Sequence, residues 1–222
     1  VIPELAKQNL PLEEVVKILH GWGTRGSSAQ LEVLSAPSEG YNISGKYRSI
    51  WVMIGGETSY WCPEETKVPE LMKLFSRQVE SFSRALDKNN RVLPQAVYEQ
   101  GVIQYATHVL QRFTDIHPMR DGNGRTGRFL YEYLIIKHLG ENSKYRRIPM
   151  RERANGEPTL DLNLMELQKK MTMRDYPTRL DQISGEALSK SLKTETLDNV
   201  LCDPLLIEFS EKVKNLVAER DK

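Results

Sequence analysis

The sequence has little that would mark it for a membrane or for a nucleic acid. It has no apolar run long enough to cross a bilayer and no secretion-type N-terminus. Its 31 basic and 30 acidic residues leave a formal net charge of +1, so no basic excess indicates binding to nucleic acid or to a membrane surface. Internal repeats, zinc-ligand spacings and Walker loops are also absent. These absences direct attention to local motifs.

Cysteine is also scarce. Cys62 and Cys202 lie far apart without metal-like spacing, so we expect two reduced thiols and a cytoplasmic protein rather than a disulfide. The 222 residues, 39% of them hydrophobic, suffice for one globular domain with a full core. The sequence begins with Val1 rather than Met, which leaves open whether it is a fragment of a longer protein.

The most informative stretch runs from His117 to Arg128. It contains a candidate base, a carboxylate, two glycines that flank an amide, and two arginines. Behind it, apolar residues recur at helical spacing from Phe129 to Leu139, and Gly140 suits a helix end. We therefore predict a loop that leads into the N-terminus of a helix.

Such a loop is suited to holding an anion. The first N–H groups of a helix have no internal partner, and the helix dipole adds positive charge there. Gly122 and Gly124 allow a sharp turn and a close approach to a ligand. Arg125 and Arg128 are three residues apart, so both can reach one polyphosphate.

Two further residues complete a reactive site. Asp121 offers a hard oxygen ligand for a magnesium ion that bridges phosphates. His117 lies just upstream and could accept a proton from an attacking hydroxyl. Base, metal ligand, anion nest and arginines together predict transfer of a phosphate-containing group to a hydroxyl.

The stretch resembles the motif of the Fic family, His-x-Phe-x-Asp/Glu-Gly-Asn-Gly-Arg-x-x-Arg, at every fixed position except one. Met119 stands where the motif has Phe. We expect this position to be a buried apolar anchor, a role that Met can fill. The Gly-Asn-Gly-Arg core is similar to that of the nucleotidyl-transferring branch, whereas the related Doc kinases have a different core.

The resemblance implies a protein adenylyltransferase, which moves AMP from Mg-ATP to a Ser, Thr or Tyr hydroxyl of a target protein. His117 is then the general base, and Asp121 holds Mg²⁺ on the α- and β-phosphates. The side chain of Asn123 is expected to donate to a phosphate. The phosphates and the departing pyrophosphate are expected to be held by Gly122, Asn123, Gly124, Arg125 and Arg128.

Several alternatives stay open. Other Fic-like proteins transfer UMP or phosphocholine with much the same loop, because the loop fixes only the phosphates. A catalytically weak binding module with a Fic fold and a phosphatase or NTPase are further alternatives. The resemblance leaves open whether the protein acts in its own cytoplasm or is delivered into a host cell as a bacterial effector or toxin.

A second feature lies upstream, between Lys46 and Cys62. A β-like run, a Gly-Gly turn and a returning run predict a β-hairpin, which could simply pack on the helices. The resemblance implies instead the Fic flap, which holds the backbone of the target protein by strand addition. The candidate contact residues are Trp51, Val52, Met53, Ile54, Gly55, Gly56 and Tyr60.

The expected fold is mainly α: a Fic-type helical core with a β-hairpin flap before the motif loop. We expect an N-terminal extension over residues 1–44, the core over 45–155 (flap 46–62, motif 117–128) and packing helices over 156–222. His20 and His108 are interpreted as structural or surface histidines. Periodicity predicts a short helical turn and five further helices, with a loop at Arg151–Pro158: Pro3–Asn9, Leu10–His20, Val68–Leu86, Pro94–Asp115, Leu160–Met173 and Asp203–Arg220.

Many Fic proteins carry a helical brake, Ser/Thr-x-x-x-Glu-Gly/Asn, whose Glu pairs with the second motif arginine, here Arg128. The stretch Ser35–Gly40 fits these letters but contains Pro37, which disrupts a helix. Ser191–Thr196 lacks the final Gly or Asn, and its Glu195 is the other inhibitory candidate. We expect no brake within this chain, which leaves control to a regulatory partner or a missing segment, if there is any.

Overall fold

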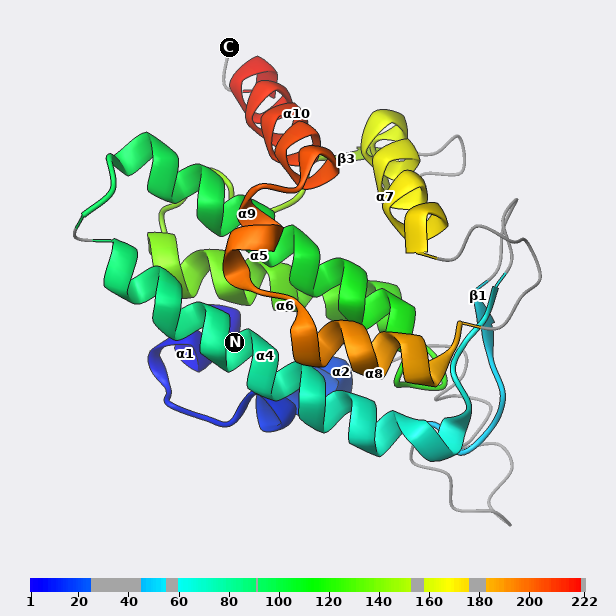
Figure 1. The fold of residues 1–222 in the computed structure, drawn as a ribbon. Helices are drawn as coiled ribbons and strands as arrows, with labels where there is room; N and C mark the ends of the chain where they lie inside the picture. The colour runs from blue at the N-terminus through cyan, green and yellow to red at the C-terminus, as the bar shows by residue number, and fades with distance from the viewer. Residues whose placement is uncertain (25–44, 55–59, 91, 153–157, 176–182, 221–222) are drawn as a thin grey trace.

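The protein is mainly helical (Figure 1). The computed structural model describes residues 1–24, 45–54, 60–90, 92–152, 158–175 and 183–220. No helix in these ranges is both long and apolar enough to cross a membrane. The helices are α1 (Ile2–Lys7), α2 (Leu12–Gly23), η1 (Glu65–Lys67), α4 (Val68–Asn89), α5 (Gln95–Ile116), α6 (Asn123–Leu139), α7 (Leu162–Asp175), α8 (Gly185–Thr194), α9 (Leu197–Leu201) and α10 (Pro204–Arg220). The strands are β1 (Met53–Ile54), β2 (Tyr60–Trp61), β3 (Met150–Glu152) and β4 (Pro158–Leu160).

Helix α5 forms the centre of the molecule. Every residue from Gly101 to Phe113 is buried, so α5 is covered by other elements on all sides over this length. Helix α6 packs closely on it at Gly127, where an added Cβ would lie only 2.7 Å from the Cδ1 atom of Leu110. The motif loop joins these two helices, so both of its ends are fixed by the core.

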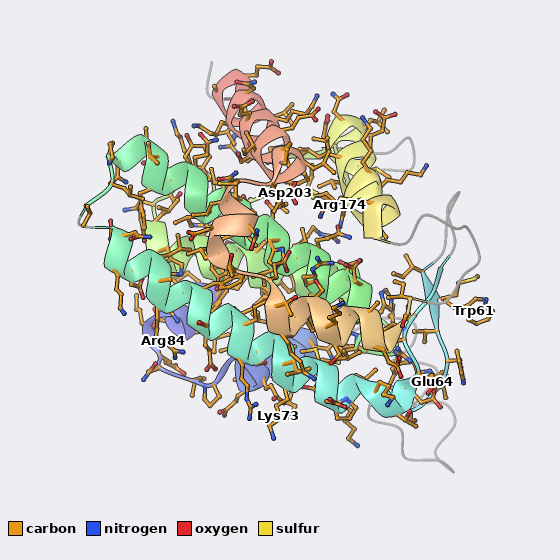
Figure 2. All side chains as sticks on the ribbon, in the orientation of Figure 1. Trp61, Glu64, Lys73, Arg84, Arg174 and Asp203 are labelled. Carbon is orange, nitrogen blue, oxygen red and sulfur yellow. The ribbon has the colours of Figure 1, made fainter. Side chains whose placement is uncertain are left out.

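The remaining helices cover this pair. Helices α1 and α2 pack on α6, while α4 packs on α5 and carries α8 alongside it (Figure 1). Helices α7 and α10 lie together over another part of α5 (Figure 1). The facing side chains of Arg174 and Asp203 form an ion pair that joins α7 to the start of α10 (Figure 2).

The mainly α fold predicted from the sequence is confirmed, and so is a hairpin before the motif, since β1 pairs with β2 in antiparallel fashion. The prediction of a loop over Arg151–Pro158 was wrong at both ends of this range. There β3 pairs with β4, with Met150 opposite Leu160. The Asn-Gly pair at 155–156 is as typical of a hairpin turn as of a loop, which explains the error. Cys62 and Cys202 are both free thiols, as expected.

Candidate active site

The N-terminus of α6 lies within the motif itself. The helix begins at Asn123, six residues before the predicted start, so Arg125 and Arg128 lie in its first two turns rather than in a loop. The first bond that closes the helix runs from the N–H of Thr126 to the carbonyl of Gly122 at 2.9 Å. The backbone N–H groups of residues 123–125 therefore have no partner within the helix and are available to an anion.

Gly122 caps this helix in a conformation that requires glycine. Its φ of 75° and ψ of 8° lie in the left-handed region. An added Cβ would lie 2.9 Å from the Cγ2 atom of Thr24, which is fully buried at the end of α2. The position is therefore restricted by both the backbone and its surroundings.

His117 ends helix α5, also in the left-handed region. With φ 49° and ψ 57°, it is the one non-glycine residue with positive φ in the ranges that the structure describes. Its Nδ1 lies 3.2 Å from the carbonyl oxygen of Thr114. Because a carbonyl can only accept, Nδ1 carries the proton and the Nε2 lone pair is left for another partner.

The electrostatic surroundings keep this imidazole neutral. The pKa of His117 is lowered to about 4, chiefly by burial and also by the nearby cation of Arg48, while the Thr114 carbonyl and Asp121 act in the opposite direction. The side chain is therefore in its basic form at neutral pH. A neutral imidazole with a free Nε2 is the form that a general base requires.

Asp121 and the two arginines surround the helix N-terminus. A carboxylate oxygen of Asp121 lies 3.4 Å from Nη2 of Arg125, and both side chains are partly exposed. The Nη1 atom of Arg128 lies 3.6 Å from the point where a Cβ on Gly124 would be. Burial, followed by the charge of Arg125, lowers the pKa of Arg128. Two neighbouring cations, one of them largely desolvated, favour a bound anion.

Asn123 makes contacts within the loop that the sequence did not predict. Its Oδ1 accepts the backbone N–H of Met119 at 2.9 Å, and its Nδ2 donates to the carbonyl of Met119 at 2.8 Å. The side chain is buried, so it closes the loop upon itself rather than pointing at a ligand. Met119 is fully buried, which confirms its predicted role as an apolar anchor.

Two residues that the sequence did not single out for the site hold the loop from outside. His20 donates from Nε2 to the carbonyl of Asp121 at 2.9 Å and accepts the N–H of Gly45 at Nδ1, also at 2.9 Å. The side chain of Arg48 donates from Nε to the carbonyl of His117 at 2.8 Å. The backbone N–H of Arg48 donates to the carbonyl of Pro118, also at 2.8 Å. The partners lie about 70 to 100 positions apart, so no local pattern could have revealed them.

Comparison with known proteins agrees with this geometry. A profile described as Fic/DOC family matches residues 24–135, which is half of the chain. This protein belongs to the Fic/DOC family. Members of the family are generally transferases that move a phosphate-containing group onto a target. No curated protein gives a significant match.

The fold of a Fic protein can also be compared directly. A solved structure titled as a Fic domain containing signaling protein from Bacteroides thetaiotaomicron VPI-5482 is similar, with a TM-score of 0.49 and 14% sequence identity. The similarity covers 93% of this chain and 66% of that chain, so this Fic protein spans slightly less than two thirds of that structure's length.

The hairpin that corresponds to the expected Fic flap exposes large apolar side chains. Met53 lies opposite Trp61 and Ile54 opposite Tyr60 in the two-residue strands. The rings of Trp51 and Trp61 meet edge to face at 6.4 Å, and Trp61 projects from the edge of the molecule (Figure 2). The Val52 carbonyl accepts the N–H of Cys62 at 3.1 Å. Gly55 and Gly56, which were also predicted to contact the target, lie outside the described residues.

The brake expected of many Fic proteins is not formed by Glu195. Its carboxylate forms an ion pair with Nη2 of Arg112 at 3.4 Å and lies 3.3 Å from Nε2 of His108, rather than pairing with Arg128. Glu195 follows the last residue of α8, and His108 and Arg112 are buried on α5, so this contact fixes the end of α8 against α5. In the described part of the chain no carboxylate forms an ion pair with Arg128. The other candidate, Ser35–Gly40, lies outside that part.

The residues at the motif also fit the expected magnesium ion. Asp121 is the carboxylate beside the anion nest, and its side chain is about 44% exposed. Mg²⁺ usually binds through one or two carboxylates together with phosphates and water, so one carboxylate is sufficient when a nucleotide is bound. Among the described residues no group of three or more His, Cys, Asp and Glu side chains could hold a metal by itself. The donor set therefore suits an ion that arrives with the nucleotide.

Proposed function

We propose that this protein transfers AMP from ATP to a hydroxyl side chain of a target protein. The observation that supports it best is the neutral imidazole of His117, whose Nδ1–H is held by Thr114 and whose Nε2 has no partner among the described residues. This base lies six residues before a helix N-terminus with open N–H groups and two arginines. A base beside a phosphate cradle is the arrangement needed to activate a hydroxyl for attack on phosphorus.

The residues present support each part of the reaction. The hydroxyl oxygen forms a bond to the α-phosphorus, and its proton passes to Nε2 of His117. The bond between the α-phosphorus and the oxygen bridging to the β-phosphate breaks, and pyrophosphate leaves with the electron pair. The open N–H groups at the start of α6, together with Arg125 and Arg128, stabilise the charge that develops. Asn123 positions these N–H groups through its bonds to Met119.

Asp121 is the residue that would hold Mg²⁺ in the ternary complex. When bound, the ion neutralises charge on the phosphates. The Asp121 carboxylate is already oriented by Arg125, and its backbone carbonyl is held by His20. These two contacts set the position of the carboxylate relative to the helix N-terminus before a nucleotide arrives.

The target is proposed to bind at the flap. In the described residues β1 and β2 form a two-stranded sheet, and the N–H of Ile183 donates to the Trp61 carbonyl of β2 at 2.8 Å. The edge of β1 is therefore the better candidate for adding an extended target segment. Arg48 connects this segment to the motif loop, which would set the target hydroxyl relative to His117.

The experiment is to incubate the protein separately with Mg²⁺ and each of ATP, UTP, GTP, CTP and CDP-choline, then to measure its intact mass. A gain of one AMP with ATP, absent in His117→Ala, supports the proposal through self-modification. Arg128→Ala should also lose the gain, whereas Arg84→Ala, on the exposed face of α4, should retain it (Figure 2). A gain only with another donor, or none with a supplied target, would contradict adenylyl transfer.

A further inference from the structure

A cavity of about 840 Å³ adjoins the motif at Arg128. Helices α1, α2, α6 and α10 and the segment 146–150 provide its walls. Arg128 belongs both to this cavity and to the motif, since its guanidinium also lies near Gly124. A ligand whose phosphates lie on the motif could therefore continue into the cavity.

The charges of the cavity favour an anionic ligand. Four arginines line it, against the two carboxylates of Glu132 and Asp161. Glu132 is shared between Arg146 at 3.3 Å and Arg147 at 3.8 Å, so one carboxylate faces two cations. Arg128 has no carboxylate partner in the described part of the chain, and its burial lowers its pKa. The surplus of guanidinium groups suits phosphate oxygens.

An aromatic surface forms another part of the wall. The ring of Trp22 lies 4.7 Å from that of Phe129 and remains 37% exposed. Gly23 allows this approach, because a Cβ there would lie 2.8 Å from the Phe129 ring. Trp22 is also two residues from His20, which binds the motif carbonyl of Asp121. The aromatic surface is therefore held in a fixed relation to the phosphate site.

We propose that this cavity binds a second nucleoside that carries phosphates. Arginines beside an exposed aromatic ring match the two parts of a nucleotide, its phosphates and its base. The volume also suits a ligand of nucleotide size, whereas pyrophosphate would fill only part of it. The second nucleoside is either the far end of a dinucleoside polyphosphate donor or a free nucleotide.

The first of these ligands, a dinucleoside polyphosphate donor, rests on the proposed function. It would change only the leaving group of the reaction. With a dinucleoside tetraphosphate, the target hydroxyl forms a bond to the α-phosphorus and gives its proton to His117. The α–β bridging bond breaks, and the remainder leaves as a nucleoside triphosphate rather than as pyrophosphate. AMP is still the group transferred.

The test measures binding by calorimetry in the presence of Mg²⁺, using His117→Ala so that the ligands are not consumed. We expect one diadenosine tetraphosphate per chain, bound about tenfold more tightly than ATP, because base stacking on an aromatic ring is typically worth that much. Trp22→Ala should reduce this advantage to near unity, and Trp22→Phe should keep most of it. Arg147→Ala should weaken binding of the tetraphosphate, whereas the matched Arg84→Ala should not.

The two sources give different stoichiometries. Two ATP molecules per chain, with the second lost in Trp22→Ala, would assign the cavity to a free nucleotide. A single ATP, no advantage for the tetraphosphate and no effect of Trp22→Ala or Arg147→Ala would overturn the proposal. Binding is measured apart from transfer, so tight binding without AMP transfer by the wild type would contradict the proposed function and leave the cavity assignment intact.

Discussion

Replacing Arg48 tests whether the motif loop is held in place by the flap segment. Arg48 is only 4% exposed, and its guanidinium donates to three carbonyls, those of His117 at 2.8 Å, Ile50 at 3.1 Å and Pro63. Arg48→Met keeps most of the side-chain length but removes all three bonds. Arg48→Lys keeps the charge but not the planar fork that reaches three acceptors at once.

The expected loss follows from these contacts. A hydrogen bond from a charged donor contributes about 1.5–3 kcal/mol. Bonds made by one group are not additive, and removing the buried cation also removes its desolvation cost, so we expect a loss of about 3–5 kcal/mol. This is a large part of a typical unfolding free energy of about 5–15 kcal/mol. The urea midpoint should fall by about 1–2 M, with a smaller fall for Arg48→Lys.

The assay is urea unfolding followed by circular dichroism, with Lys46→Met as the control because Lys46 is exposed two residues earlier. That control should stay within about 0.5 kcal/mol of the wild type. The pKa of His117, followed by NMR of its ring protons, should rise in Arg48→Met, since the cation of Arg48 lowers it. An unchanged midpoint together with an unchanged pKa would refute the proposed connection.

Three further predictions concern the backbone, the histidines and Glu195. Gly122→Ala should lose at least about 1–2 kcal/mol of stability in thermal unfolding, because Gly122 has a φ of 75° and lies near the Thr24 methyl. The loss should exceed that of the control Gly124→Ala, whose Cβ would meet a guanidinium at 3.6 Å. All four histidines have pKa values below 6.5, chiefly through burial. The unfolded chain therefore takes up protons first, and the free energy of unfolding should fall from pH 7 to pH 5.5 by up to about 1 kcal/mol per histidine; constant stability over this range would contradict the burial argument. Glu195→Ala should lower stability by about 2–4 kcal/mol by leaving the buried Arg112 with fewer partners, without the rise in transfer rate that loss of a brake would cause.

The parts of the candidate site could be recognised in advance because they are consecutive in the sequence. From His117 to Arg128, the residue types and their spacing specify a base, a carboxylate and a helix N-terminus with two cations. Helical periodicity likewise predicts α4, α5 and α10, because each has to bury one or more apolar faces. Local patterns are sufficient for features that are set locally.

The contacts that support the site could not be predicted, because they join residues that are far apart in the sequence. His20 lies at the end of one helix and binds a carbonyl 101 positions away, and Arg48 reaches 69 positions to His117. The contacts of Asn123 were also not predicted, because its amide binds a backbone partner only four residues back. The start of α6 was placed too late, since Gly124 and Gly127 disfavour a helix by propensity although packing imposes one.

The strained backbone of His117 shows why these supports would matter for the proposed function. The left-handed backbone of His117 costs about 1–2 kcal/mol, and such a conformation persists only where its surroundings hold it. Arg48 binds the carbonyl of His117, and Asn123 closes the following turn by binding Met119. His20 holds the carbonyl of Asp121, at the other end of that turn. None of these three side chains is oriented toward a nucleotide by its observed contacts. The position of the Nε2 lone pair relative to the helix N-terminus therefore depends on residues outside the chemistry. Substitutions there should reduce the rate of transfer more than the affinity for the nucleotide.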